Sequence, residues 1–320
     1  MQSVVYYMKD LPSGGILPHK IIKNYNKDTF SFTLSGLSYQ EVLELDKEKS
    51  SCMSKLAKLE VLIRHLIPNE LMQLPICDMF YIMLQRSLLS GLDFVGDTKN
   101  QIAYEKANPG KFYQNRPYFL SKVVCPHCGK VHNQVAFDLN DIEIMRLEDD
   151  LMAGRKRWKD IIVFDFNGKD VFYDFEFPTI KKFWEVLKVY LSEYNSTSDE
   201  DYYLQLKIIT LATALTIHKE NQLNDEVSDI NCSEKINNIK DIFNNITGGD
   251  AMKIESLYSD LIQPIAFIRF DCLCKGGSVI DITYSITDIL RLLFVNRERV
   301  VQQIYDIEDS IESEHSSDGL

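Results

Sequence analysis

The 320-residue sequence has no apolar run of the roughly 18–20 residues that a membrane-spanning helix needs. It also has no basic surplus, because 35 Lys and Arg face 47 Asp and Glu and the formal net charge is −12. A protein that coats nucleic acid needs a positive surplus to neutralise phosphates. The first residues lack the basic and apolar regions of a secretory signal. We therefore expect no membrane span and no specific nucleic-acid partner.

The sequence also lacks the motifs that most readily indicate an enzyme. It contains no P-loop, no dinucleotide-binding glycine pattern after a strand, no nucleophile elbow and no HExxH motif. The acidic strand 170–177 invites interpretation as a metal-dependent nuclease, but Pro178 stands where a Glu-x-Lys pair needs its lysine. We expect no catalytic residue and no small-molecule substrate.

Hydrophobic periodicity predicts an α+β fold that combines helices with short antiparallel strands. Ser38 and Glu41 have the spacing of a capping box, and Gly91 suits the end of a helix. In the first half we expect a strand at 29–34, helical segments over 39–66 with a break near Ser50 and over 76–90, and a hairpin over 118–139. In the second half we expect a hairpin over 160–177, helices at 179–194, 198–219, 233–245, 250–263 and 286–296, and a strand–knuckle–strand unit over 265–284.

The two halves repeat one order of elements. The triplet that begins at Glu41 matches the triplet that begins at Glu185, an offset of 144, and Cys125 matches Cys272 at an offset of 147. This pattern predicts a tandem duplication of two helix-rich units, each with a small antiparallel sheet and a cysteine-knuckle hairpin resembling a zinc ribbon. The expected boundaries are 1–147 for the first unit, 148–159 for a linker, 160–305 for the second unit and 306–320 for an acidic disordered tail.

Seven cysteines form an odd set, and the expected compartment is reducing, so a disulfide framework is not predicted. Three of them stand alone and are expected to be ordinary free thiols: Cys52, Cys77 and Cys232. The other four form two close pairs, Cys125 with Cys128 and Cys272 with Cys274.

The run Cys125-Pro126-His127-Cys128-Gly129 has the spacing of a zinc knuckle, in which two thiolates of one tight turn face a single metal. We expect a structural zinc at Cys125 and Cys128, to which His132 could add a third ligand. Cys272 and Cys274 could complete the set if the two knuckles face each other. The other interpretation is a zinc ribbon that has lost its metal. A thioredoxin-like redox role would require the motif to open a helix, whereas Gly129 and a β-rich segment follow it.

Taken together, several motifs resemble the baseplate hub and hub-assembly proteins of T-even-type phages with contractile tails. The resemblance rests on element order over 8–297 and on short motifs: LPSGG, Asp78-Met79-Phe80, Leu84-Gln85-Arg86-Ser87, CPHC, Phe137-Asp138-Leu139, and in the second half Phe175-Glu176-Phe177-Pro178-Thr179, Ile262, Cys272-Leu273-Cys274 and Leu293-Phe294. The second cysteine pair departs from it, because Cys-x-Cys stands where Cys-x-x-Cys is expected.

This resemblance implies a non-enzymatic role in tail morphogenesis, with other tail and baseplate proteins as partners. The implied location is the virion baseplate, or the host cytoplasm during assembly. Methionines around one expected helical hairpin suit either an adaptable partner surface or the core. The alternative function is a zinc-ribbon adaptor in viral transcription or replication.

Overall fold

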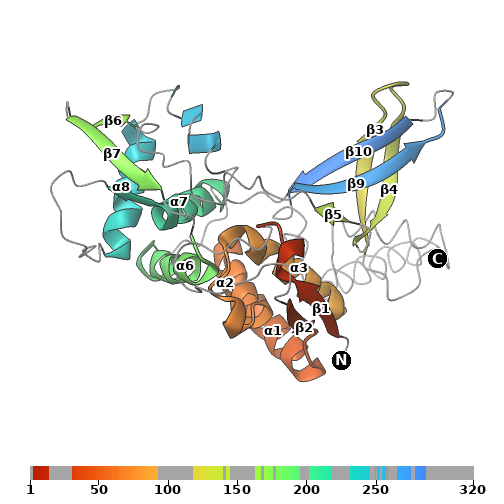
Figure 1. Ribbon diagram of the computed structural model, residues 1–320, viewed down its shortest axis with the longest axis horizontal. Coiled ribbons are helices and arrows are strands. Elements are labelled where there is room, and N and C mark those ends of the chain that lie inside the picture. The colour runs from red at the N-terminus through yellow and green to blue at the C-terminus, as the bar shows by residue number, and fades with distance from the viewer. Residues whose placement is uncertain are drawn as a thin grey trace, which may run out of the picture.

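A computed structural model describes the chain as an α+β protein (Figure 1). The described residues are 3–13, 31–92, 118–139, 142–144, 163–166, 169–175, 178–194, 202–217, 231–245, 249, 251, 252, 254–256, 258, 265–274 and 278–285. Their helices are η1 (Met8–Asp10), α1 (Tyr39–Ser51), α2 (Lys55–Leu66), η2 (Asn69–Leu71), α3 (Ile76–Leu89), α6 (Ile180–Tyr194), α7 (Tyr202–Ala214) and α8 (Cys232–Asn245). None of these helices is long and apolar enough to cross a membrane.

The strands of the described residues pair as antiparallel ladders. They are β1 (Ser3–Tyr7), β2 (Ser31–Ser35), β3 (Tyr118–Val124), β4 (Val131–Asp138), β5 (Glu143–Ile144), β6 (Val163–Phe166), β7 (Lys169–Phe175), β8 (Leu215–Ile217), β9 (Ile265–Cys272) and β10 (Ser278–Ser285). The sheets have the orders β1-β2, β3-β4, β6-β7-β8 and β10-β9-β5. The pairing of Phe166 with Lys169 confirms the expected hairpin in the second half.

The ends of the first helices follow from local side-chain chemistry. The Ser38 side chain accepts a hydrogen bond from the Glu41 amide, and the Glu41 carboxylate accepts one from the Ser38 amide, so the expected capping box is confirmed. The expected break between α1 and α2 falls at Cys52, and the Ser54 side chain caps α2. Gly91, at φ +66°, follows the end of α3 in the left-handed conformation that glycine favours.

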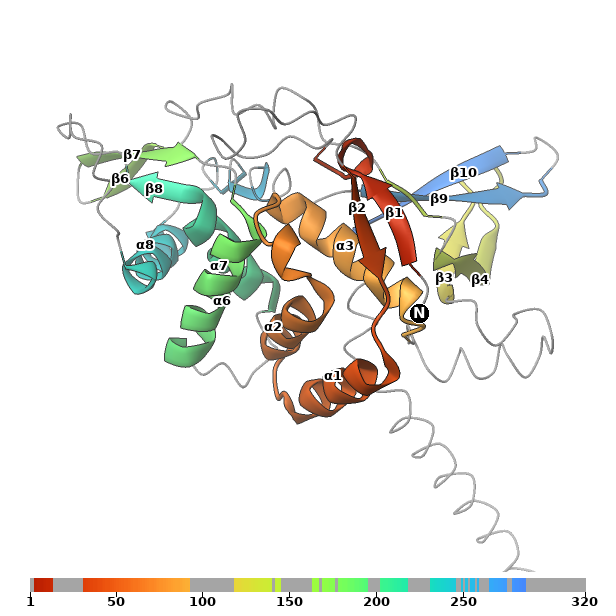
Figure 2. The same cartoon turned by 60° about the horizontal axis from the view of Figure 1, so that its bottom comes forward.

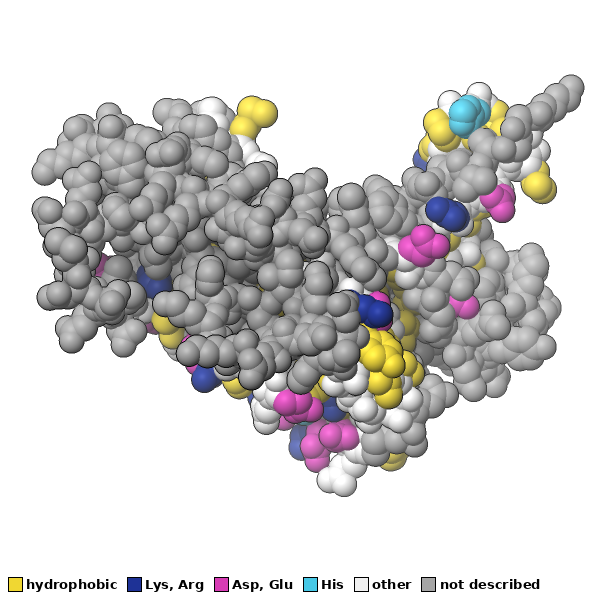
Figure 3. Space-filling model, viewed as in Figure 1, with side chains coloured by type: hydrophobic (Ala, Val, Ile, Leu, Met, Phe, Trp, Pro, Cys, Tyr) yellow, Lys and Arg dark blue, Asp and Glu magenta, His cyan; other side chains and the backbone are white. Residues whose placement is uncertain are grey.

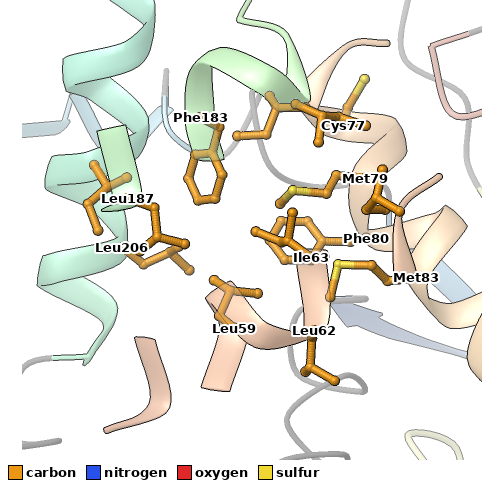
Figure 4. Close-up of a cluster of buried hydrophobic side chains, with 14 of the residues drawn as sticks. Leu59, Leu62, Ile63, Cys77, Met79, Phe80, Met83, Phe183, Leu187 and Leu206 are labelled. Carbon is orange, nitrogen blue, oxygen red and sulfur yellow. The ribbon is translucent and has the colours of Figure 1, made fainter. Parts of the chain in front are cut away.

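The helices of both halves share one hydrophobic core. Phe80 and Met83 of α3, Phe183 of α6 and Leu206 of α7 are fully buried in it (Figure 4). Most of the methionines near α2 and α3 fill this core, while Met53 is 79% exposed. The core interpretation of the methionines therefore holds for all but one of them.

Backbone hydrogen bonds join the start of α3 to the start of α6. The Ile76 amide donates to the Pro178 carbonyl at 3.0 Å, and the Ile180 amide donates to the Leu74 carbonyl at 2.9 Å. The Thr179 side chain accepts from the Lys182 amide at 3.2 Å, so Thr179 caps α6 as expected. The two halves are thus connected by backbone bonds as well as by the shared core.

The end of α7 differs from expectation. The sequence predicts a helix through about Lys219, but α7 ends at Ala214 and β8 follows at once. Leu215, Thr216 and Ile217 pair with the end of β7. Pairing with β7 supplies the backbone hydrogen bonds of this β-branched segment, which overrides its helical pattern.

Two hairpins project together from the helical body: β3–β4 from the first half and β9–β10 from the second (Figures 1 and 2). The short β5 of the first half pairs with β9, where Glu143 lies opposite Phe267. Strands from both halves therefore build this projecting region.

Among the described residues, the first half runs as β1–β2, then α1, α2 and α3, then β3–β4. The second half runs as β6–β7, α6, α7, β8 and α8, with further helical residues between 249 and 258 before β9–β10. β4 and β10 even share the offset of 147, since Val131 corresponds to Ser278. Among the strands that the structure describes, two pairings have no counterpart in the other half, because β8 joins only the second half's sheet and β5 joins only β9. The expected linker 148–159, the expected helix 286–296 and the expected tail 306–320 lie outside the described residues.

Candidate metal centre

The first cysteine knuckle is the tight turn between β3 and β4. The Cys125 amide donates to the Lys130 carbonyl at 3.0 Å, and the Gly129 amide donates to the Cys125 carbonyl at 2.9 Å. Gly129 has φ +68°, a conformation that residues with a Cβ rarely adopt. This turn brings Cys125 and Cys128 to one end of the hairpin.

The second knuckle follows β9. Cys272 is the last residue of this strand and lies opposite Ser278 of β10. Leu273 turns its side chain into solvent with 99% exposure, while Cys274 is half-buried. Apolar side chains also lie on the visible face at the far end of the projecting hairpins (Figure 3).

The four paired cysteines meet at this end. The sulfurs of Cys125, Cys128, Cys272 and Cys274 all lie within 4.8 Å of one another. The Sγ atoms of Cys128 and Cys272 are 3.8 Å apart. In a tetrahedral site with Zn–S bonds of about 2.3 Å, two sulfurs lie about 3.8 Å apart, so the cluster has the dimensions of a four-thiolate zinc site.

The four cysteines of the cluster differ in their exposure to solvent. Cys125 and Cys272 are buried, Cys274 is half-buried and Cys128 is exposed. Desolvation and then hydrogen bonding with the Cys125 thiol raise the pKa of Cys272 to about 12. The Cys272 thiol therefore keeps its proton at neutral pH, unless a cation stabilises its thiolate.

His132 lies beside this cluster. Its Nε2 is 3.5 Å from the Cys272 sulfur, and its ring packs edge-on against Phe270 at 4.8 Å between centroids. Four sulfurs are enough ligands for a tetrahedral site without His132. The structure nevertheless brings His132 of the first half next to Cys272 of the second. A ring nitrogen at this distance can instead hydrogen-bond a ligating sulfur.

The setting of the CPHC motif does not support a thioredoxin-like role. Such a motif lies at the N-terminus of a helix, whose dipole lowers the pKa of its first thiol. Here Cys125 and Cys128 lie in the tight turn between β3 and β4, and β4 begins at Val131. The acidic strand considered for nuclease chemistry coincides with β7 up to Phe175, and Glu176 and Phe177 lie outside the described residues.

The structure adds one buried acid that the sequence interpretation did not single out. Asp78 of α3 is fully buried and accepts hydrogen bonds from the Ser13 amide at 2.8 Å and the Ser13 hydroxyl at 2.7 Å. Burial raises the pKa of Asp78 to about 7, although the bonds from Ser13 oppose this shift. An acidic residue within the apolar run of α3, after an LPSGG turn, was the available signal.

Comparisons of the chain with family models, with curated proteins and with solved structures find no match.

Proposed function

We propose that this chain is a non-enzymatic tail-assembly protein of a contractile-tailed phage, and that one structural zinc clamps its two halves together. The observation that carries the zinc proposal is the cluster of four sulfurs within 4.8 Å, drawn from two hairpins. A site with four protein ligands leaves no position for a substrate, which favours a structural over a catalytic metal.

The clamp also gives a physical reason for an assembly role. It fixes the β3–β4 hairpin against the β9–β10 hairpin and so holds a projecting apolar end in one shape. Exposed Val124, Val131 and Leu273 lie next to the metal ligands at this end. The phage assignment itself depends on the sequence resemblance to baseplate hub and hub-assembly proteins, whose partners are other tail proteins.

A genetic experiment tests the assembly role. A nonsense mutation in this gene should leave phage heads and genome replication intact but yield no complete contractile tails, as seen by electron microscopy of lysates. Plasmid-borne wild-type protein should restore tails, and Cys52→Ser should do so equally, because Cys52 lies outside the cluster. Normal tails without the protein would contradict the proposal.

The same experiment distinguishes the assembly role from a second candidate function. Paired hairpins that end in cysteine knuckles are also the arrangement of a zinc ribbon, which favours an adaptor in viral transcription or replication. That function predicts a block in late transcription or genome replication in the nonsense mutant. Purified virions analysed by mass spectrometry would then show whether the protein resides in the tail.

We also infer that the two halves arose by tandem duplication. The shared order of elements and the common offset of β4 and β10 support this inference. An experimentally determined structure should superpose residues 25–147 on 165–297 with the two knuckles at equivalent places. Different strand pairing or helix order in the two halves would contradict it, and the pairing of β8 with β7 is one such difference among the described residues.

A further inference from the structure

The four clustered cysteines are not equally exposed, and the exposed one has a partner in the other half. Cys128 is exposed, whereas Cys125 and Cys272 are buried. Metal-bound thiolates remain nucleophilic, and oxidants react first with those they can reach. Cys128 is therefore the sulfur that a peroxide meets first.

Cys272 is placed to react next. Its sulfur is 3.8 Å from that of Cys128, and it also exchanges hydrogen bonds with Cys125 and Cys274. A disulfide requires an S–S distance of about 2.05 Å, so the two sulfurs must approach by about 1.8 Å. Cys128 lies in the turn between β3 and β4, and Cys272 is the last residue of β9, so the approach involves only the ends of the two hairpins.

We propose that Cys128 and Cys272 are a reversible redox pair, through which peroxide replaces the metal clamp by a covalent link between the halves. This proposal rests on the proposed zinc site. The Cys128 thiolate attacks one peroxide oxygen, forms a sulfenic acid and releases hydroxide. The Cys272 thiolate then attacks the sulfenic sulfur, forms the disulfide and releases a second hydroxide. Two electrons pass from the sulfurs to the peroxide, and the metal leaves because two of its four ligands are gone.

The consequence is a second way of holding the two hairpins together. Cys128 and Cys272 are separated by 144 positions in the chain, so their disulfide closes a long loop across both halves. The hairpin contact would then survive loss of the metal. A thiol reductant cleaves the bond by exchange and returns the site to its metal-binding form.

The test uses the full-length purified protein and hydrogen peroxide. Its zinc is first measured by elemental analysis, and zinc release during peroxide treatment is followed with a chromogenic chelator. Non-reducing digestion and mass spectrometry then identify the linked peptides. We expect peroxide to release the zinc, a Cys128–Cys272 peptide to appear in step with that release, and dithiothreitol with added zinc to reverse both changes.

Two variants make the result specific. Cys128→His replaces the exposed thiolate by a nitrogen ligand that forms no disulfide, so the linked peptide should be lost. Cys52→Ser removes a half-buried thiol elsewhere and should behave as the wild type.

The outcomes separate the two proposals. A zinc-loaded chain whose peroxide product is Cys125–Cys128, or which forms no disulfide, contradicts the redox proposal alone. A chain purified without zinc that still forms the Cys128–Cys272 link contradicts the zinc clamp alone.

Discussion

The helical body and the projecting hairpins differ in how many large apolar side chains they bury. Each of α2, α3, α6 and α7 buries several large apolar side chains in one shared core. In the hairpins, by contrast, few described side chains are buried: Val123, Cys125, Phe137 and Cys272. A two-stranded hairpin alone is marginal in water, because it cannot bury enough apolar surface to offset its ordering entropy. The comparison indicates that apolar packing holds the helices. For the hairpins, we propose that a metal at the four cysteines adds to the apolar contacts of Val123 and Phe137 with the core.

The largest expected effect comes from breaking the metal site. Cys272→Ser should remove the zinc and destabilise the hairpins by several kcal/mol, because metal binding is coupled to folding. Hydrogen exchange should show loss of amide protection in β3, β4, β9 and β10, with α2 and α3 still protected. Cys232→Ser, which changes a thiol at the start of α8, is the matched control. Equal loss of protection in helices and hairpins would contradict the comparison.

The converse change should affect the helices alone. Phe80 is fully buried between α3 and its neighbours, so Phe80→Ala should lower the free energy of unfolding by about 3–5 kcal/mol. Denaturant unfolding followed by circular dichroism measures this loss. Zinc content should remain that of the wild type, and a variant that lost its zinc in the folded state would show that the two regions depend on each other.

A smaller, pH-dependent effect is expected at Asp78. Its pKa rises from 3.8 to about 7 on folding, so the folded protein holds a proton that the unfolded chain has lost between these values. The stability that this protonated group contributes is fully present below about pH 4. It decreases as the pH rises from there and is lost as the pH passes about 7. Asp78→Asn, which keeps an acceptor for Ser13, should therefore gain stability relative to the wild type over this range.

The difference should amount to a few kcal/mol at most, since about 1.4 kcal/mol corresponds to one pKa unit. Unfolding of both proteins at pH 5 and pH 8 measures it. Hydrogen bonds with Ser38 and His65 lower the pKa values of Glu41 and Glu48, so these two groups make stability rise with pH. Their contribution is the same in the wild type and in the variant, so it cancels in the difference between the two proteins. A stability difference that does not change with pH would contradict the raised pKa.

The smallest effect is expected at a helix cap of the body. Ser38→Ala removes the acceptor for the Glu41 amide and should cost about 1 kcal/mol. Ser51→Ala, at the exposed end of the same helix, is the control, because its hydroxyl only donates to the Glu48 carbonyl. Thermal unfolding should give a lower melting temperature for Ser38→Ala than for Ser51→Ala. Equal melting temperatures would show that the capping box does not stabilise the protein.

Local signals in the sequence were sufficient for much of the helical body. The capping box at Ser38 and the left-handed Gly91 act over a few residues, so helix boundaries near them could be predicted. The hairpin tip at Gly129 is likewise a local feature. The end of α7 was missed because β8 forms only when a strand distant in sequence pairs with it.

The candidate site combines local and distant information. The CPHC spacing reveals Cys125 and Cys128 as a half-site, but their meeting with Cys272 depends on how two hairpins pack. The offset of 147 indicated that the two cysteine pairs could lie together, but it did not determine the distances between them. His132 at 3.5 Å from the Cys272 sulfur shows the same limit, because spacing alone indicated a ligand next to Cys128.

X-ray absorption at the zinc edge of the full-length protein, purified without added metal, tests the central claim most directly. The account predicts about one zinc per chain, with four sulfur neighbours at about 2.3 Å and no nitrogen neighbour. A first shell that mixes two sulfurs with nitrogen or oxygen would mean that the two knuckles do not share the metal. A protein without zinc would contradict the clamp itself.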